Sequence, residues 1–342
     1  MTRGGQSANF RPMKISRASI RTSWALIFLF LTGCGNPWFS RDDAIDHYVS
    51  ALALNAAELD EDAIKELQAA VKIDRDFSLA FSLMGDLYRR QGNYEQAAGA
   101  YENACALDAW AFDDHLHLGQ VYQVLKRFVE AIKVLKRACL LQPESVEANY
   151  TLGVCFYETE DYDQAAKFCA KAAELDPSND EILASLGDIY GKSGDHYQAV
   201  NAYKQALEID GRQVEVMIKL GNTYVQMNRF APAKLILQKA IDTRGDDAQT
   251  HIAMAYCLLA ERDLEGALAG YQKAAELEKT HPDAHNGVGV AYMMMYLKDK
   301  RNKEPARQAL SSWHISLELD PDQPKIQKLV QRYTAELYPS GQ

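Results

Sequence analysis

A glycine or alanine recurs every 34 residues along this chain, seven times without a slip. The seven positions are Gly85, Gly119, Gly153, Gly187, Gly221, Ala255 and Gly289. A fixed period of this length is typical of stacked-repeat proteins, in which each unit buries its apolar face only against its neighbours. The period therefore predicts an elongated all-α chain of helix–turn–helix units, and it argues against a compact enzyme.

Other residue types recur at fixed distances from each glycine. A large aliphatic residue comes just before it, an aromatic or large apolar residue three and sixteen positions after it, and an alanine twelve and nineteen positions after it. Small residues let the two helices of a unit approach closely, and large ones fill the gaps between units. The pattern closely resembles the tetratricopeptide repeat (TPR) consensus of Leu-Gly, Tyr, Ala, Phe/Tyr, Ala and Pro.

The resemblance implies an all-α, right-handed TPR superhelix, that is, an α-solenoid of about eight repeats. We expect the repeats at 44–77, 78–111, 112–145, 146–179, 180–213, 214–247, 248–281 and 282–323. The last contains an insertion near residues 296–305, and residues 324–342 read as an amphipathic capping helix.

The N-terminal segment 1–33 has the layout of a secretory signal peptide. Lys14, Arg17 and Arg21 precede the apolar run 24–31, which is shorter than the roughly 20 residues that a spanning helix needs. The run ends at Cys34, and the sequence Leu-Thr-Gly-Cys resembles a bacterial lipobox. The alternative is a buried N-terminal helix with an incidental cysteine.

The lipobox resemblance implies that Cys34 is the lipidated residue of a lipoprotein carrying palmitate-type chains. We then expect residues 34–43 to be a short tether and the protein to face the periplasm from the outer membrane of a bacterial cell envelope. Several acyl chains give the stable anchoring that one chain does not. Both Met1 and Met13 remain candidate starts.

The resemblance also points to two groups of candidate partner-binding residues. In TPR proteins the first helix of each repeat lines a concave groove. Counted from the first residue of each repeat, positions 5, 9 and 12 face into that groove. One group there is Tyr150, Val154 and Tyr157, and the other is Tyr256, Leu259, Val290 and Met293. Exposed apolar patches mark binding sites. The alternative is that packing or the capping helix buries these residues.

The insertion carries a basic run. Lys298, Lys300, Arg301 and Lys303 lie within eight residues and are candidates for docking an acidic partner or an envelope glycan. A longer solvated turn is the simpler interpretation.

No pattern for catalysis, a cofactor or a metal stands out. His115 and His117 are two residues apart and face different ways on a helix. The cysteines other than Cys34 fall at packing positions and read as small buried side chains, with a link between Cys155 and Cys169 left open. The formal net charge of −10 argues against nucleic acid. We expect neither an enzyme nor a cofactor.

The sequence thus predicts a lipid-anchored scaffold that holds a protein or peptide in its groove. The layout resembles TPR lipoproteins that assist pilus or secretion-complex assembly. It also resembles adaptors that recruit peptidoglycan hydrolases, and a role in exopolysaccharide export is a further alternative.

Overall fold

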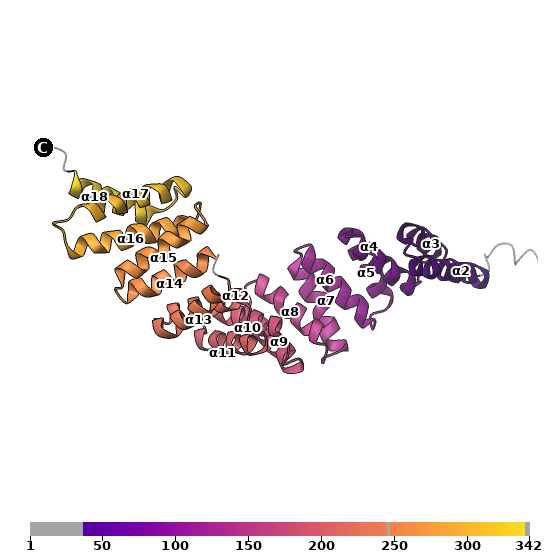
Figure 1. Cartoon of the computed structure of the whole chain (residues 1–342). Coiled ribbons are helices and arrows are strands. Elements are labelled where there is room, and N and C mark those ends of the chain that lie inside the picture. Colours follow the sequence, from indigo (N-terminus) through magenta and orange to yellow (C-terminus); the bar gives the residue numbers. More distant parts are fainter. Residues whose placement is uncertain (1–36, 245–246, 339–342) are drawn as a thin grey trace, which may run out of the picture. The chain divides into compact units, whose positions relative to one another are not determined.

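The computed structural model describes residues 37–244 and 247–338, and every described element is an α-helix or a connection between helices. The expected signal peptide and Cys34 lie outside the described residues. The chain divides into two compact units, one ending at Leu125 and the other beginning at Lys126. Helices alternate in both, and we name the first helix of each repeat A and the second B (Figure 1).

The first unit contains five helices, of which α2, α4 and α6 are A helices. They are α2 (Pro37–Ala56), α3 (Asp60–Ile73), α4 (Ser78–Arg90), α5 (Tyr94–Leu107) and α6 (Phe112–Val124). The helix α2 begins inside segment 34–43 and includes residues 37–43 of the expected tether. A proline in the first turn favours a helix start, because its missing amide has no intrahelical partner there.

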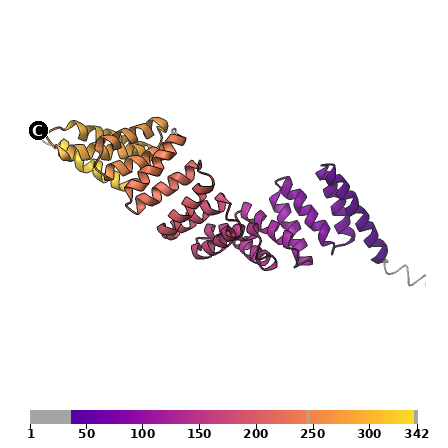
Figure 2. The same cartoon turned by 60° about the horizontal axis from the view of Figure 1, so that its bottom comes forward.

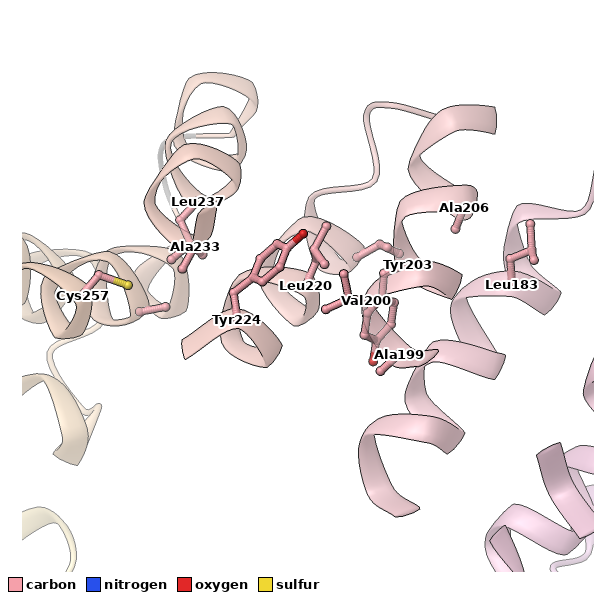
Figure 3. Close-up of a cluster of buried hydrophobic side chains, with 12 residues drawn as sticks. Leu183, Ala199, Val200, Tyr203, Ala206, Leu220, Tyr224, Ala233, Leu237 and Cys257 are labelled. Carbon is pink, nitrogen blue, oxygen red and sulfur yellow. The ribbon is translucent and has the colours of Figure 1, made fainter. Parts of the chain in front are cut away.

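The second unit begins with a B helix and ends with the cap. It contains α7 (Phe128–Leu141), α8 (Val146–Glu158), α9 (Tyr162–Leu175), α10 (Asp180–Ser193), α11 (His196–Ile209), α12 (Val214–Gln226), α13 (Phe230–Thr243), α14 (Ala248–Ala260), α15 (Leu264–Leu277), α16 (Pro282–Lys298), α17 (Glu304–Leu319) and α18 (Pro324–Leu337). Its core runs from repeat to repeat: Leu220 and Tyr224 of α12 lie between Tyr203 of α11 and Leu237 of α13 (Figure 3).

The recurring glycine lets the A and B helices of a repeat touch. A Cβ atom on Gly187 would lie 2.5 Å from the ring of Tyr203, and one on Gly85 would lie 2.6 Å from the ring of Tyr101. Real Cβ contacts are not this short, so the ring occupies the space that a side chain would need. The 34-residue period in the sequence is therefore a helix-packing requirement.

Ala255 occupies the glycine position of its repeat, and two other glycines compensate. Gly270 of the paired helix α15 lies against Ala255, where an added Cβ would be 2.9 Å from the alanine Cβ. The ring of Tyr271 packs instead on Gly287 in the next A helix. The methyl group of Ala255 is thus accommodated by a displaced aromatic ring.

In every repeat before the last, the turn from the A helix to its B helix contains one residue with positive φ, again at intervals of 34. These residues are Glu58, Gly92, Lys126, Glu160, Gly194, Asn228 and Arg262. In most of these turns two backbone amides bond back to the end of the A helix, as Glu160 N does to Tyr157 O and Asp161 N to Phe156 O. This is the Schellman ending of a helix, which favours glycine because it needs a left-handed residue.

The last repeat replaces this turn with longer helices. The helix α16 continues to Lys298, and α17 begins at Glu304, so the insertion mainly extends both helices around a short connection. The helix α18 packs against α17, as both views show (Figure 1, Figure 2). Trp313, Val330, Tyr333 and Leu337 join α17 and α18 in one buried cluster. No described helix is long and apolar enough to cross a membrane.

Candidate functional site

Three A helices of the second unit line a hollow of about 250 Å³. Tyr157 comes from α8, Asp188 and Lys192 from α10, and Lys219 from α12. The A helices contact one another from repeat to repeat, whereas the ends of their side chains remain partly accessible. The hollow therefore offers an aromatic ring and charged groups of both signs to a partner.

Asp188, which lines this hollow, is held in place by two side chains. The hydroxyl of Tyr203 donates to Asp188 Oδ1 over 2.7 Å, and Lys219 Nζ donates to Asp188 Oδ2 over 2.6 Å. Burial, together with the neighbouring charge of Asp188, raises the pKa of Tyr203, so its hydroxyl keeps its proton and acts as a donor. A carboxylate fixed from two sides presents a defined charge to a ligand.

The first unit contains the same arrangement at equivalent repeat positions, 102 residues earlier in the sequence. The hydroxyl of Tyr101 donates to Asp86 Oδ1 over 2.6 Å, and His117 Nδ1 lies 3.3 Å from the same oxygen. Burial alone would raise the pKa of Asp86, but hydrogen bonds from His117 and Tyr101, with the charges of His117 and Arg89, lower it overall. Asp86 and His117 line a hollow of about 560 Å³ together with Arg89 and Arg90.

Our sequence reasoning missed both Asp–Tyr pairs. Asp86 and Asp188 share position 9 of their repeats, and Tyr101 and Tyr203 share position 24. The sequence did contain a signal for these pairs, because these two repeats combine an aspartate at position 9 with a tyrosine at position 24.

Only part of the first predicted group reaches the hollow. Tyr157 lines it, and its ring lies 5.9 Å from the ring of Tyr162. Tyr150 is half-buried, and its hydroxyl shares a hydrogen bond with Ser185 Oγ over 2.9 Å, which ties α8 to α10. Val154 is half-buried on the same helix.

The second predicted group divides between surface and core. Tyr256 on α14 is 49% exposed, and Leu259 and Val290 are half-buried. Met293 is 4% exposed and packs in the cluster that contains Val330 and Tyr333 of the cap. Met293 therefore does not lie on an open surface, because it packs in a cluster formed by side chains of α16, α17 and α18, and the prediction for this residue is wrong.

The basic run is partly neutralised by acids. Lys300 Nζ lies 3.8 Å from Glu336, and Arg301 Nε lies 3.1 Å from Asp299. Lys298 and Arg301 line a hollow of about 490 Å³ that also contains Asp263, Glu265 and Asp299. The surface is thus of mixed charge and not a basic patch.

The described cysteines are all free. Cys155, Cys169 and Cys257 are buried, and Cys105 and Cys139 are partly buried. Burial raises the pKa of the Cys155 and Cys169 thiols to about 12 each, so both remain protonated. No link joins Cys155 and Cys169. Among the described residues no group of His, Cys, Asp and Glu side chains has the arrangement of a metal site.

Comparison with solved structures shows TPR-like folds. PilF of Pseudomonas aeruginosa is 21% identical, and the match covers 65% of this chain and 97% of that chain with a TM-score of 0.52. The Cut9–Hcn1 complex of the APC/C is 14% identical, and the match covers 80% of this chain and 52% of that chain with a TM-score of 0.50.

A third solved structure, YrrB, is described as a TPR protein with an unusual peptide-binding site. It is 22% identical, and the match covers 58% of this chain and 97% of that chain with a TM-score of 0.47. No curated protein matches the sequence.

A family model gives the assignment of the chain. The TPR model described as the cilia and flagella-associated protein 70 C-terminal domain matches residues 43–289, which is well over half of the sequence. The helix pairs, the glycine contacts and the Schellman turns recur over the same residues. The chain belongs to the tetratricopeptide-repeat family that this C-terminal domain defines.

Proposed function

We propose that the protein is a scaffold that binds a segment of a partner protein on its A-helix surface. The observation that carries the proposal is the hollow lined by Tyr157, Asp188, Lys192 and Lys219. An aromatic ring beside fixed charges binds a peptide by apolar contact and orients it by hydrogen bonds. Tyr256, with its large exposed fraction, is a second contact on the A helices of the same unit.

We propose further that Cys34 anchors this scaffold by lipid to the outer membrane of a bacterial cell, facing the periplasm. The support is the basic segment, the short apolar run and the lipobox-like sequence that precede Cys34. Since α2 begins three residues after Cys34, the first repeat would lie close to the membrane surface.

The partners that we propose are components of a pilus or secretion complex. The support is the lipoprotein layout of the sequence together with TPR repeats. Peptidoglycan hydrolases or exopolysaccharide-export proteins, captured in their place, would assign the scaffold to those systems.

Partner binding is tested by crosslinking in cells, followed by affinity capture and mass spectrometry. The variant combines Tyr157→Ala and Tyr256→Ala, and the matched control is Tyr197→Ala, a tyrosine that is 73% exposed on the B helix α11. We expect the double variant to lose most of the captured partner while the control keeps it. Equal capture by all three proteins would remove the binding site from the A-helix surface.

Anchoring is tested by fractionation of cells that produce the Cys34→Ser variant. We expect the variant in the soluble fraction and the unsubstituted protein in the membrane fraction. A variant that stays with the membrane would refute the lipid anchor, and it would leave the capture experiment unaffected.

A further inference from the structure

The helix α7 is locally basic in a chain that is acidic overall. Residues 126–141, which comprise α7 and the end of the turn before it, contain five basic side chains and one acidic one, whereas the whole chain has a formal net charge of −10. The acid, Glu130, is paired with Arg127, whose Nε lies 3.2 Å from the carboxylate. The five bases are Lys126, Arg127, Lys133, Lys136 and Arg137.

Four exposed residues of α7 lie on one face of the helix. Val129, Lys133, Lys136 and Leu140 are separated by four, three and four residues, a spacing that brings side chains to one side of an α-helix. Val129 is 73% exposed and Leu140 is 72% exposed, and both lysines are exposed as well. We call these four residues the α7 stripe. It has two lysines between two apolar side chains.

The repeat fold does not require the two apolar ends of the α7 stripe. The positions equivalent to Val129 and Leu140 are each acidic in four of the six other repeats that keep the period. These acids are Glu61, Glu95, Asp163 and Glu265 at the first position, and Glu174, Glu208, Asp242 and Glu276 at the second. The helix α7 thus has exposed apolar side chains where other repeats have acids, which indicates a binding surface.

Neither lysine of the α7 stripe is neutralised. No described acid pairs with Lys133 or Lys136, and Lys136 Nζ lies 5.1 Å from the centre of the Phe156 ring of α8. Contact with a ring leaves the ammonium charge in place. The next acid along the chain, Glu144, lies beyond the end of α7. The next B helix, α9, adds no net charge, because its exposed bases equal its exposed acids in number: Lys167, Lys171, Asp163 and Glu174.

We propose that the α7 stripe binds an anionic phospholipid surface. The lysines attract the negative headgroups, and Val129 and Leu140 enter the boundary between headgroups and acyl chains, as the apolar side chains of basic amphipathic helices do. A membrane surface needs no pocket, and no residue of α7 lines any of the hollows described above. A helical peptide partner, in contrast, is bound in a groove.

The lipid contact lies apart from the proposed partner site. The hollow around Tyr157 is lined mainly by the A helices α8, α10 and α12, whereas the α7 stripe lies on a B helix. Contact with lipid through α7 therefore leaves the hollow free for a partner. The proposal does not require lipidation of Cys34, and its test uses a chain without it.

Cosedimentation with vesicles tests the proposal. The protein is the chain from residue 34 onward with Cys34→Ser, since the basic and apolar segment 1–33 would itself bind anionic vesicles, and this part contains every described helix. We expect it to bind vesicles of equal parts phosphatidylglycerol and phosphatidylcholine, and to leave them as NaCl rises to about 1 M, where charges are screened. We expect much weaker binding to phosphatidylcholine alone. Equal binding to both vesicles, or binding to neither, would overturn the proposal.

Two pairs of substitutions locate the contact. Lys133→Gln with Lys136→Gln should lower the affinity for the anionic vesicles by about 30-fold, because each basic residue near such a surface contributes about five-fold. Lys204→Gln with Lys239→Gln is the matched control, since it changes the net charge equally at exposed lysines of the B helices α11 and α13. The control should bind like the unsubstituted chain. Equal losses in both pairs would refute a contact at α7. Circular dichroism checks that all variants are folded.

The apolar end of the stripe is tested by Leu140→Ala. We expect a loss of affinity of about eight-fold, as for half of the removed carbon atoms lying in lipid. Leu235→Ala, at a leucine that is 78% exposed on α13, is the control and should bind normally. Full affinity of Leu140→Ala would exclude insertion of the stripe. A chain that ignores vesicles, but needs Lys133 and Lys136 to capture an acidic protein in cells, would assign the stripe to a protein partner and overturn the lipid proposal.

Discussion

Gly153→Ala is the substitution that most directly tests why the 34-residue glycine exists. A Cβ at this position would lie 3.0 Å from the backbone nitrogen of Cys169 and 3.2 Å from the carbonyl oxygen of Ala165, and it would overlap Cys169 Sγ. Backbone atoms do not rotate away as a side chain does. The helices α8 and α9 must therefore separate to admit one methyl group.

The magnitude follows from two opposing terms. Overpacking of a tight core costs about 1 to 3 kcal/mol, and the backbone contacts put this site at the upper end. Replacing glycine by alanine inside a helix returns about 0.8 to 1 kcal/mol. We expect a net loss of about 2 kcal/mol in the free energy of unfolding.

Gly99→Ala is the matched control. Gly99 lies inside α5, and no atom lies within 4 Å of the Cβ that alanine would add. Only the helix-propensity term applies, so this variant is expected to gain about 0.5 to 1 kcal/mol.

Urea unfolding of the full chain, followed by circular dichroism, measures both variants. Because repeat proteins lose cooperativity along their length, hydrogen exchange of the amides in α8 and α9 locates the loss. Equal stability of Gly153→Ala and the unsubstituted chain would refute the packing explanation of the period. So would a Gly99→Ala variant as unstable as Gly153→Ala.

Four further substitutions test other parts of the fold. Burial raises the pKa of Asp114, which is 6% exposed, so the folded chain becomes less stable as this carboxyl group ionises. As the pH rises from acid to neutral, we expect Asp114→Asn to gain stability relative to the unsubstituted chain. Urea unfolding midpoints across this pH range measure the difference. Gln323→Ala removes a side chain that donates to Ser316 O over 3.0 Å, and we expect a loss of about 1 to 3 kcal/mol with faster exchange in α18. In the positive-φ turns, Gly194→Ala should lower the melting temperature whereas Glu160→Gly should raise it, since only the non-glycine residue carries left-handed strain.

The fold was predictable because packing repeats where the sequence repeats. The glycine at position 8 and the large side chain at position 24 meet in three repeats, at Gly85 and Tyr101, at Gly187 and Tyr203, and at Gly221 and Leu237. The left-handed turn residue was harder to find. Glycine marks it only at Gly92 and Gly194, and the remaining five turns use residues such as Glu160 that carry no such signal.

The candidate site was predictable only where the repeat alone determines exposure. Tyr157 lines the hollow between α8, α10 and α12, and Tyr256 is exposed, as their positions in the repeat predicted. Met293 has an equivalent position in its own repeat, but it is buried in a cluster that also contains side chains of α17 and of the capping helix α18. The period in the sequence contains no information about where a segment outside the period will pack.

The two Asp–Tyr pairs show how a uniform scaffold acquires distinct surfaces. Where position 24 is tyrosine and position 9 is aspartate, as in Tyr203 and Asp188, the hydroxyl reaches the A-helix surface and fixes a charge there. Tyr271 has the same position 24, but its repeat has Ala255 and Tyr256 in place of glycine and aspartate, and its ring turns onto Gly287. The repeat with Asp188 presents a fixed carboxylate on the A-helix surface, and the repeat with Tyr256 presents a half-exposed aromatic ring. The residues at positions 8 and 9 therefore help to determine which side chain each repeat presents on the A-helix surface.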